Sequence, residues 1–134
     1  MEEYRALRKT HSILELAKTP ELACEVTLQP LRALAVDAAI LFADILLVVE
    51  PMGLKLRFSP GPSISNPVRT ADDIKRLKVE GAAAKLGCVF EAVRLIRREI
   101  DGKQALIGFA GAPFTVASYM IEGGPSDHYR IAKA

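Results

Sequence analysis

The chain has 134 residues, of which 50% are hydrophobic and 25% are charged, a composition typical of a globular protein. Its 18 Lys and Arg residues against 16 Asp and Glu residues give a net charge of +2. This charge is too small to indicate a nucleic-acid partner or a polybasic membrane surface. At this length we expect one small domain or a piece of a larger one.

Neither a membrane span nor a targeting segment is predicted. The longest apolar run, residues 35–49, is interrupted by Asp37 and Asp44 and falls short of the roughly 20 residues that cross a bilayer. The amino terminus, MEEYRALRKTH, lacks the apolar core of a signal peptide. Cys24 and Cys88 lie far apart and outside any metal-binding pattern. We therefore expect two buried thiols in a cytoplasmic protein.

Helical and strand-like stretches alternate along the chain, which is typical of an α/β fold with parallel strands. We expect a short helix over residues 12–18 and a longer one over 20–34, with a kink at Pro30. Residues 36–42 are apolar on both faces apart from Asp37. That pattern predicts a buried parallel strand covered by helices on both sides.

The middle of the chain predicts an excursion away from this sheet. Residues 54–58 alternate between apolar and basic side chains, as in a half-exposed strand. The stretch SPGPSISNP, residues 59–67, predicts loop or turn only. Thr70 and Asp73 have the spacing of a capping box at the start of a short helix.

The last third of the chain predicts another strand between helices. Residues 82–100 have apolar side chains at helical spacing, and 105–110 form a second buried strand. Pro113 suits the first turn of a helix, and Ser126 or Asp127 is expected to cap a further one. The two buried strands should lie parallel, joined by a right-handed crossover. Two such units leave apolar strand edges and surface exposed.

Asp44 is the leading candidate for chemistry, because its neighbours in ILFADIL are apolar and aspartate is rarely buried without a partner. From the residues alone, a structural cap or ion pair is an equal alternative. Asp37 lies at the start of its strand, which favours a structural role. For Tyr119, helical periodicity favours a core position over a ligand contact.

Two glycines mark a turn from strand to helix, but they form no nucleotide-binding motif. Gly108 and Gly111 lack the third glycine of a dinucleotide fingerprint and the Lys-Ser/Thr of a P-loop. Close packing of strand and helix is the favoured explanation. His11 and His128 are isolated in polar surroundings, where we expect solvated side chains. No metal site is predicted from these spacings.

Four segments resemble the uroporphyrinogen decarboxylase family. They are residues 27–46, 60–70, 91–100 and, most specifically, LIGFAGAPFTVASYMIEGG over 106–124. The resemblance covers nearly the whole chain. It implies the fold of a distorted (β/α)8 TIM barrel. It also implies that the complete protein is a homodimeric carboxy-lyase of haem and porphyrin biosynthesis. Such enzymes remove carbon dioxide from the four acetate arms of uroporphyrinogen III, giving coproporphyrinogen III, without any cofactor.

The resemblance assigns roles to three side chains. Asp44 matches an aspartate that binds the central pyrrole N–H groups and stabilises the positive charge of a carbon-protonated pyrrole. Tyr119 matches a tyrosine that reaches the substrate, and Phe109 matches a pocket phenylalanine. We expect Asp44 and Tyr119 to open toward one cleft at the carboxyl ends of the strands. Ala43 replaces the serine that the family usually has there, which removes at most one hydrogen bond.

The resemblance also implies missing parts. The family's RQAGRY segment, whose arginines grip the substrate carboxylates, is expected before Glu3-Tyr4-Arg5, and its later serine and histidine are absent. We therefore expect residues 1–134 to be a single partial barrel domain, truncated at both ends and inactive alone. A complete barrel needs about 250 residues.

Two alternatives stay open. The first is a related barrel, a corrinoid-dependent methyltransferase, which uses zinc bound by Cys and His residues on later strands; the FADIL and YMIEGG segments argue against it. The second is a non-catalytic interaction module that keeps barrel pieces for packing. A Cys cluster further along the reading frame would favour the first alternative, and coproporphyrinogen formation would exclude the second.

Overall fold

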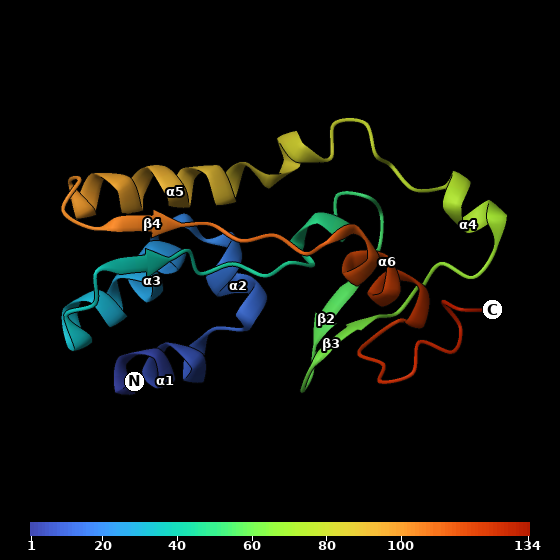
Figure 1. Cartoon of the computed structure of the whole chain (residues 1–134), viewed down its shortest axis with the longest axis horizontal. Coiled ribbons are helices and arrows are strands. Elements are labelled where there is room, and N and C mark those ends of the chain that lie inside the picture. Colours follow the sequence, from blue (N-terminus) through green and yellow to red (C-terminus); the bar gives the residue numbers. More distant parts are fainter. The chain divides into compact units, whose positions relative to one another are not determined.

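The computed structural model describes all 134 residues, which form two compact units (Figure 1). The first unit comprises Met1–Asp44 and Gly87–Phe109. The second comprises Ile45–Leu86 and Ala110–Ala134. None of the helices has both the length and the apolar character needed to span a bilayer.

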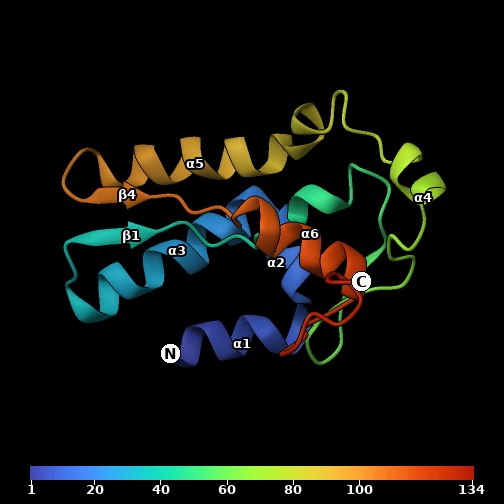
Figure 2. The ribbon, with the colours of Figure 1, turned by 45° about the vertical axis from the view of Figure 1, so that its right-hand side comes forward.

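The first unit is an α/β structure built on two parallel strands that lie side by side (Figure 2). Strand β1 (Ala38–Ile40) pairs with β4 (Ala105–Ile107), and Ala39 lies opposite Leu106. The helices are α1 (Glu2–Thr10), α2 (Ile13–Lys18) and α3 (Pro20–Leu34) before β1, and α5 (Gly87–Ile100) before β4. The predicted α/β class, the parallel pairing and the long helix before β4 are confirmed.

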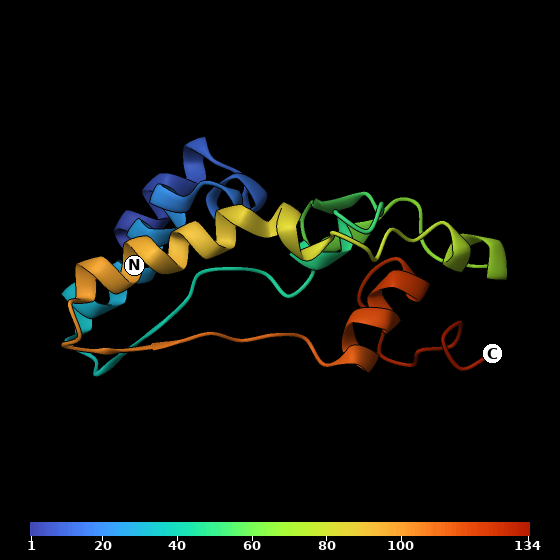
Figure 3. The same cartoon turned by 90° about the horizontal axis from the view of Figure 1, so that it is seen from above.

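Helices α3 and α5 pack against each other over one face of the two strands (Figure 3). The buried cluster between them consists of Ala23, Cys24, Leu41, Ala92, Ile96 and Ile100. Three-residue strands form few ladder hydrogen bonds, so burial of these apolar side chains supplies most of the stability of the strand pair.

The helix ends follow the local sequence signals. Helix α3 begins at Pro20, where a missing N–H costs nothing, and ends at Ala35 in the left-handed conformation (φ 48°). Helix α5 ends at Ile100, and Asp101 and Gly102 follow at positive φ, with the Lys103 N–H donating to the Ile100 carbonyl at 2.8 Å.

The opposite face of the strands is open, which contradicts the prediction that helices cover both sides of residues 36–42. Ala39 and Leu41 are buried against the helices, whereas Ile40 on the other face is 62% exposed. On β4 and just after it, Ile107 and Phe109 are 48% and 49% exposed. The predicted exposure of apolar strand surface is therefore confirmed, because no element of the unit lies over that face.

The second unit contains a small antiparallel hairpin and short helices. Its elements are the 3₁₀ turn η1 (Leu47–Val49), strands β2 (Leu56–Phe58) and β3 (Pro62–Ile64), helix α4 (Ala71–Lys75), the 3₁₀ turn η2 (Ala83–Leu86) and helix α6 (Pro113–Glu122). Leu56 pairs with Ile64, and each is 4% exposed. The expectation of loop or turn only over residues 59–67 was therefore wrong at β3. Pro62 is tolerated because an edge strand needs no donor on its outer side.

Two further sequence interpretations require correction. Helix α1 has no counterpart among the predicted elements, which begin at residue 12. No helix follows Ser126, although its Oγ accepts the Tyr129 N–H at 3.0 Å in the manner of a cap. Tyr129 has a φ of 50°, a left-handed conformation that does not continue a right-handed helix. The Glu122 carboxylate instead binds the N–H groups of Ile131 and Ala132, each at 2.9 Å.

Both cysteines are free thiols. Cys24 is buried as predicted, and that burial raises the pKa of its thiol. Cys88 is half-buried rather than buried, because it lies in the first turn of α5, ahead of the residues that contact the core.

One buried side chain ties α3 to the chain that leaves β1. The Thr27 hydroxyl donates to the Ala23 carbonyl at 2.7 Å and accepts the Phe42 N–H at 2.8 Å. We predict that Thr27→Val destabilises the chain by about 1–3 kcal/mol, because the Phe42 N–H loses its acceptor. Urea unfolding followed by circular dichroism measures the loss.

Thr27→Ser is the matched control for this variant. It keeps the hydroxyl and removes one methyl group, so it should cost only about 0.8 kcal/mol. Equal destabilisation by Thr27→Val and Thr27→Ser would show that methyl packing matters and the hydrogen bond does not.

The predicted capping box at α4 is present. Thr70 Oγ1 accepts the Asp73 N–H at 3.2 Å, while Asp73 Oδ2 accepts the N–H groups of Arg69 at 3.0 Å and Thr70 at 2.9 Å. These bonds, led by that from the Arg69 backbone, lower the pKa of Asp73. The stabilisation is therefore complete above the unfolded-state pKa and is lost as pH falls through the lower folded-state pKa.

We predict that carboxyl ¹³C NMR finds Asp73 titrating at lower pH in the folded chain than in urea. Thr70→Ala removes the hydroxyl partner and should move the folded-state pKa part of the way back. An identical Asp73 titration in folded and unfolded chains would contradict the role assigned to the capping box.

Candidate active site

The chain that leaves the carboxyl end of β1 carries Asp44, the first sequence candidate. The Leu41 N–H donates to the Ile107 carbonyl of β4 at 3.0 Å, and the Phe42 N–H is held by Thr27. These two bonds, one from each side, fix the backbone just before Asp44. Its side chain is half-buried. An acidic group therefore lies past the carboxyl end of a parallel strand, where α/β proteins place ligand-binding residues.

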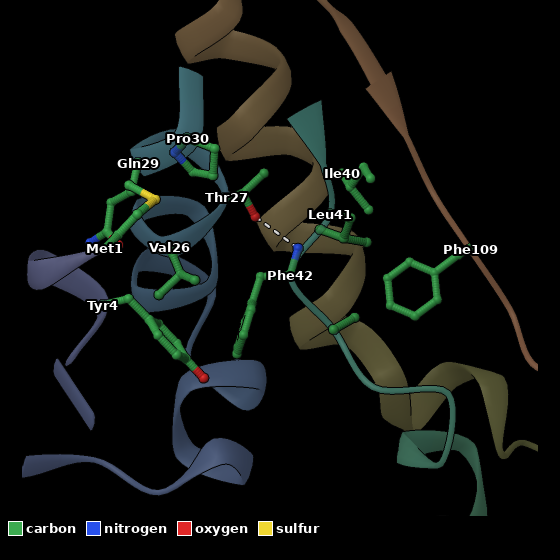
Figure 4. A pocket seen from close by; sticks show the side chains of 11 residues that line it. Met1, Tyr4, Val26, Thr27, Gln29, Pro30, Ile40, Leu41, Phe42 and Phe109 are labelled. Atoms are coloured by element: carbon green, nitrogen blue, oxygen red, sulfur yellow. Dashed lines mark hydrogen bonds between the residues drawn. The ribbon is translucent and has the colours of Figure 1, made fainter. Parts of the chain in front are cut away.

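Phe109 and the segment before Asp44 line a cavity of about 480 Å³ in the first unit (Figure 4). The cavity is also lined by Met1 and Tyr4 of the amino-terminal segment, by Val26, Thr27, Gln29 and Pro30 of α3, and by Ile40, Leu41, Phe42 and Ala43. The Tyr4 and Phe42 rings lie 6.0 Å apart at their centroids. The predicted pocket residue Phe109 and the residues that directly precede Asp44 in the sequence therefore line one mostly apolar cavity.

Gln29 is the most buried amide of this cavity and was not singled out from the sequence. Its Nε2 donates to Glu25 Oε1 at 3.2 Å, while its Oε1 is buried and has no hydrogen-bond partner. A buried acceptor without a donor costs about 1–3 kcal/mol. No pattern in the sequence marks it, because an i to i+4 pair on a helix is commonly a solvent-exposed contact.

Tyr119, the second candidate, is a half-buried residue of α6 in the second unit. Its carbonyl accepts the N–H of Gly123, which ends the helix in the left-handed conformation. Asp44 belongs to the first unit and Tyr119 to the second. Their opening toward one cleft stays a prediction.

Arg69 anchors the carboxyl end of the helix that bears Tyr119. Its guanidinium donates to the carbonyls of Ile121 and, at 3.1 Å, Glu122. Cationic side chains are favourable at this end of a helix, where carbonyls lack helical partners. No local sequence pattern marks this role, since the two contacts join segments that are remote along the chain.

The two glycines of the strand-to-helix turn differ. A Cβ on Gly111 would lie 2.7 Å from Val116 Cγ2 and 3.3 Å from Ile45 Cβ, so close packing requires glycine there, as expected. A Cβ on Gly108 would meet nothing within 4 Å. The packing explanation therefore holds for Gly111 and is wrong for Gly108.

The remaining polar candidates lie apart from the cavity. Asp37 is exposed, and its backbone carbonyl accepts the Ala105 N–H at 3.3 Å. His128 is exposed as expected, whereas His11 is half-buried, with Nδ1 at 2.8 Å from Thr10 Oγ1. No group of three or more His, Cys, Asp or Glu residues lies close enough to hold a metal ion.

Comparison with known proteins gives one consistent family. Residues 1–134 match the model of the family described as Uroporphyrinogen decarboxylase (URO-D). Curated proteins of that name are 62% identical in Sorangium cellulosum, 59% in Alkalilimnicola ehrlichii and 56% in Trichlorobacter lovleyi. The matches cover 99%, 98% and 98% of this chain but 38%, 37% and 38% of those proteins. The chain thus spans less than two fifths of the length of these relatives.

A solved structure of a methyltransferase from Methanosarcina mazei is also similar, with a TM-score of 0.59 over 80% of this chain and 33% of that one. The two sequences are 24% identical. At that level the likeness shows the fold alone.

The contrast between the two glycines gives a test of packing at the turn. We predict that Gly111→Ala destabilises the chain by about 1–3 kcal/mol, because the new methyl group overlaps Val116. Gly108→Ala is the control and should leave stability unchanged or raise it by about 0.4–1 kcal/mol through a less flexible unfolded state. Urea midpoints measure both, and equal midpoints would remove packing as the reason for Gly111.

Proposed function

This chain belongs to the uroporphyrinogen decarboxylase family, and we propose that it contributes part of the active site of such an enzyme. The reaction is the cofactor-independent removal of carbon dioxide from the acetate side chains of uroporphyrinogen III, which gives coproporphyrinogen III. The observation that carries the proposal is the family match over the whole chain, with Asp44 placed just after the carboxyl end of a parallel strand.

The proposal places the first unit in a (β/α)8 barrel. Parallel β1 and β4 with helices on one face have the arrangement of neighbouring barrel units, in which the other face of the strands lines the interior. The exposed Ile40 and Ile107 would then be interior residues of the complete cylinder. The single-domain assignment of residues 1–134 belongs to this proposal.

Asp44 is the proposed catalytic residue. Its carboxylate would accept hydrogen bonds from the pyrrole N–H groups and so hold the centre of the macrocycle. Protonation of a pyrrole carbon makes the ring cationic, and the C–C bond to the carboxylate then breaks, with its electron pair forming a C=CH2 bond to the ring as carbon dioxide leaves. The CH2 carbon then gains a proton and the ring carbon loses the one it had gained, which restores the pyrrole and leaves a methyl group. A fixed negative charge beside that cation stabilises the transition state more than the ground state.

Phe109 and Tyr119 are the proposed substrate contacts. Phe109 and Ala43 line the same mostly apolar cavity, which supports an apolar contact between the Phe109 ring and the macrocycle. Tyr119 would supply a hydroxyl from α6 at the same rim. The substrate's carboxylates need arginine partners, which the family resemblance places outside these residues. We therefore propose that the 134 residues alone do not turn over substrate, and that the complete enzyme is a cytoplasmic homodimer.

The other functional classes have less support. The methyltransferase alternative rests on a likeness that shows the fold alone. A non-catalytic module would keep the packing residues without any need for a carboxylate after β1. Formation of coproporphyrinogen therefore separates decarboxylation from both alternatives.

The test is a chimera in which this chain replaces the matching segment of the Sorangium cellulosum relative. We predict that the chimera forms coproporphyrinogen III and that Asp44→Asn lowers kcat about a hundredfold, or ~3 kcal/mol, because the charge beside the developing cation is lost. Tyr119→Phe should cost only about 0.5–1.5 kcal/mol, since one hydroxyl contact disappears.

Asp37→Asn is the matched control, because Asp37 is exposed at the start of β1 and should leave turnover unchanged. Near-normal turnover by the Asp44→Asn chimera would remove Asp44 from the mechanism. A folded chimera without decarboxylase activity would overturn the proposed function itself.

A further inference from the structure

The chain between β3 and α4 supplies hydrogen bonds to four consecutive carbonyls at the carboxyl end of α6. The Ile64 N–H donates to the Gly123 carbonyl and the Val68 N–H to the Met120 carbonyl, each at 2.8 Å. The two carbonyls between them accept the Arg69 guanidinium. We call these four bonds the α6 clamp. The last carbonyls of a helix lack helical partners, so the clamp satisfies the groups at which this helix would otherwise fray.

Arg69 provides both side-chain bonds of the α6 clamp, and its own backbone is held in place. The Arg69 N–H donates to Asp73 Oδ2 at 3.0 Å, and the same oxygen accepts the Thr70 N–H at 2.9 Å in the capping box of α4. The Arg69 side chain is exposed, so its two bonds compete with water and each contributes modestly. Loss of this side chain should therefore loosen the end of α6 without unfolding the second unit.

Tyr119 belongs to the turn that the α6 clamp closes. Its carbonyl accepts the Gly123 N–H at 2.9 Å, and the next residue, Met120, is buried and bonded to Val68. The direction in which a side chain leaves a helix is set by the backbone of its own turn. The phenol of a tyrosine lies at the far end of its side chain, so opening of this turn displaces the Tyr119 hydroxyl.

We propose that Arg69 is a positioning residue for Tyr119, which holds the last turn of α6 closed and so fixes the direction of the Tyr119 hydroxyl. The inference rests on the proposed function in one respect, the assignment of that hydroxyl to the substrate. A direct contact between Arg69 and a substrate carboxylate is the competing role for a cation here. It is disfavoured because the guanidinium already donates to two carbonyls of α6.

The first test follows amide hydrogen exchange by NMR in the 134-residue chain. Arg69→Ala should make the Gly123 N–H exchange about two- to fivefold faster, the factor expected for a cation at the carboxyl end of a helix. The Val116 N–H donates to the Ala112 carbonyl at 3.0 Å in the first turn of α6 and should exchange at an unchanged rate. Arg69→Lys keeps the charge but not the fork of donors, so it should recover part of the protection.

The second test measures decarboxylation by the chimera with the Sorangium cellulosum relative. Arg69→Ala should lower kcat/KM by the same factor, about two- to fivefold, because fewer molecules hold the hydroxyl in place. In a Tyr119→Phe background it should have no further effect, since the hydroxyl that it positions is gone. Arg76→Ala is the matched control: Arg76 is an exposed arginine that pairs with Asp73 Oδ1 at 3.4 Å, and its loss should leave kcat/KM unchanged.

Three results would overturn the proposal. One is an unchanged Gly123 exchange rate in Arg69→Ala. Another is equal acceleration at Gly123 and Val116, which would make Arg69 a general stabiliser of the unit. The third is an undiminished loss in the Tyr119→Phe background with a raised KM, which would assign Arg69 to a substrate carboxylate. An unaltered chimera without activity would instead contradict the proposed function, and the exchange rates would still decide whether Arg69 holds the turn.

Discussion

The parallel contact between β1 and β4 is the constraint on which the first unit depends. Two strands of three residues each cannot hold together through their ladder alone. Helices α3 and α5 supply the rest by burying Ile96, Ile100 and Leu41 against one face. Because all the stabilising cover lies on that face, the opposite face is left with Ile40, Ile107 and Phe109 in solvent.

The same contact positions the candidate chemistry. The Leu41 N–H, just after β1, donates to the Ile107 carbonyl of β4. The next N–H, that of Phe42, donates to the Thr27 hydroxyl of α3. The backbone before Asp44 is therefore fixed by the strand partner and by the helix layer together. In the second unit Arg69 has a comparable role, because it ties residues 67–70 to the carboxyl end of α6, the helix that carries Tyr119.

Local sequence signals predicted what depends on neighbouring residues. The helix over 20–34, the capping box of Thr70 and Asp73, and the parallel pair follow from periodicity and cap chemistry. Strand β3 was missed because its Pro and Ser residues resemble a turn, and only pairing with β2 makes it a strand. Arg69 and Gln29 could not be found, since their roles depend on contacts that no spacing encodes. The role proposed for Asp44 rests on family resemblance, because its apolar neighbours fit a catalytic carboxylate and a structural cap or ion pair equally well.

The prediction that helices cover both faces of β1 was wrong, and the apolar pattern behind it needs a physical explanation. Residues 36–42 are apolar on both faces, a pattern of strands buried on both sides, yet the 134 residues cover only one. Exposed apolar residues that are contiguous on a sheet face mark a surface that becomes covered. The unpaired backbone of Ala38 and Ile40 points the same way, because a bare edge favours pairing with another strand. Sequence pattern and open edge thus agree that β1 has the character of an interior strand of a larger sheet.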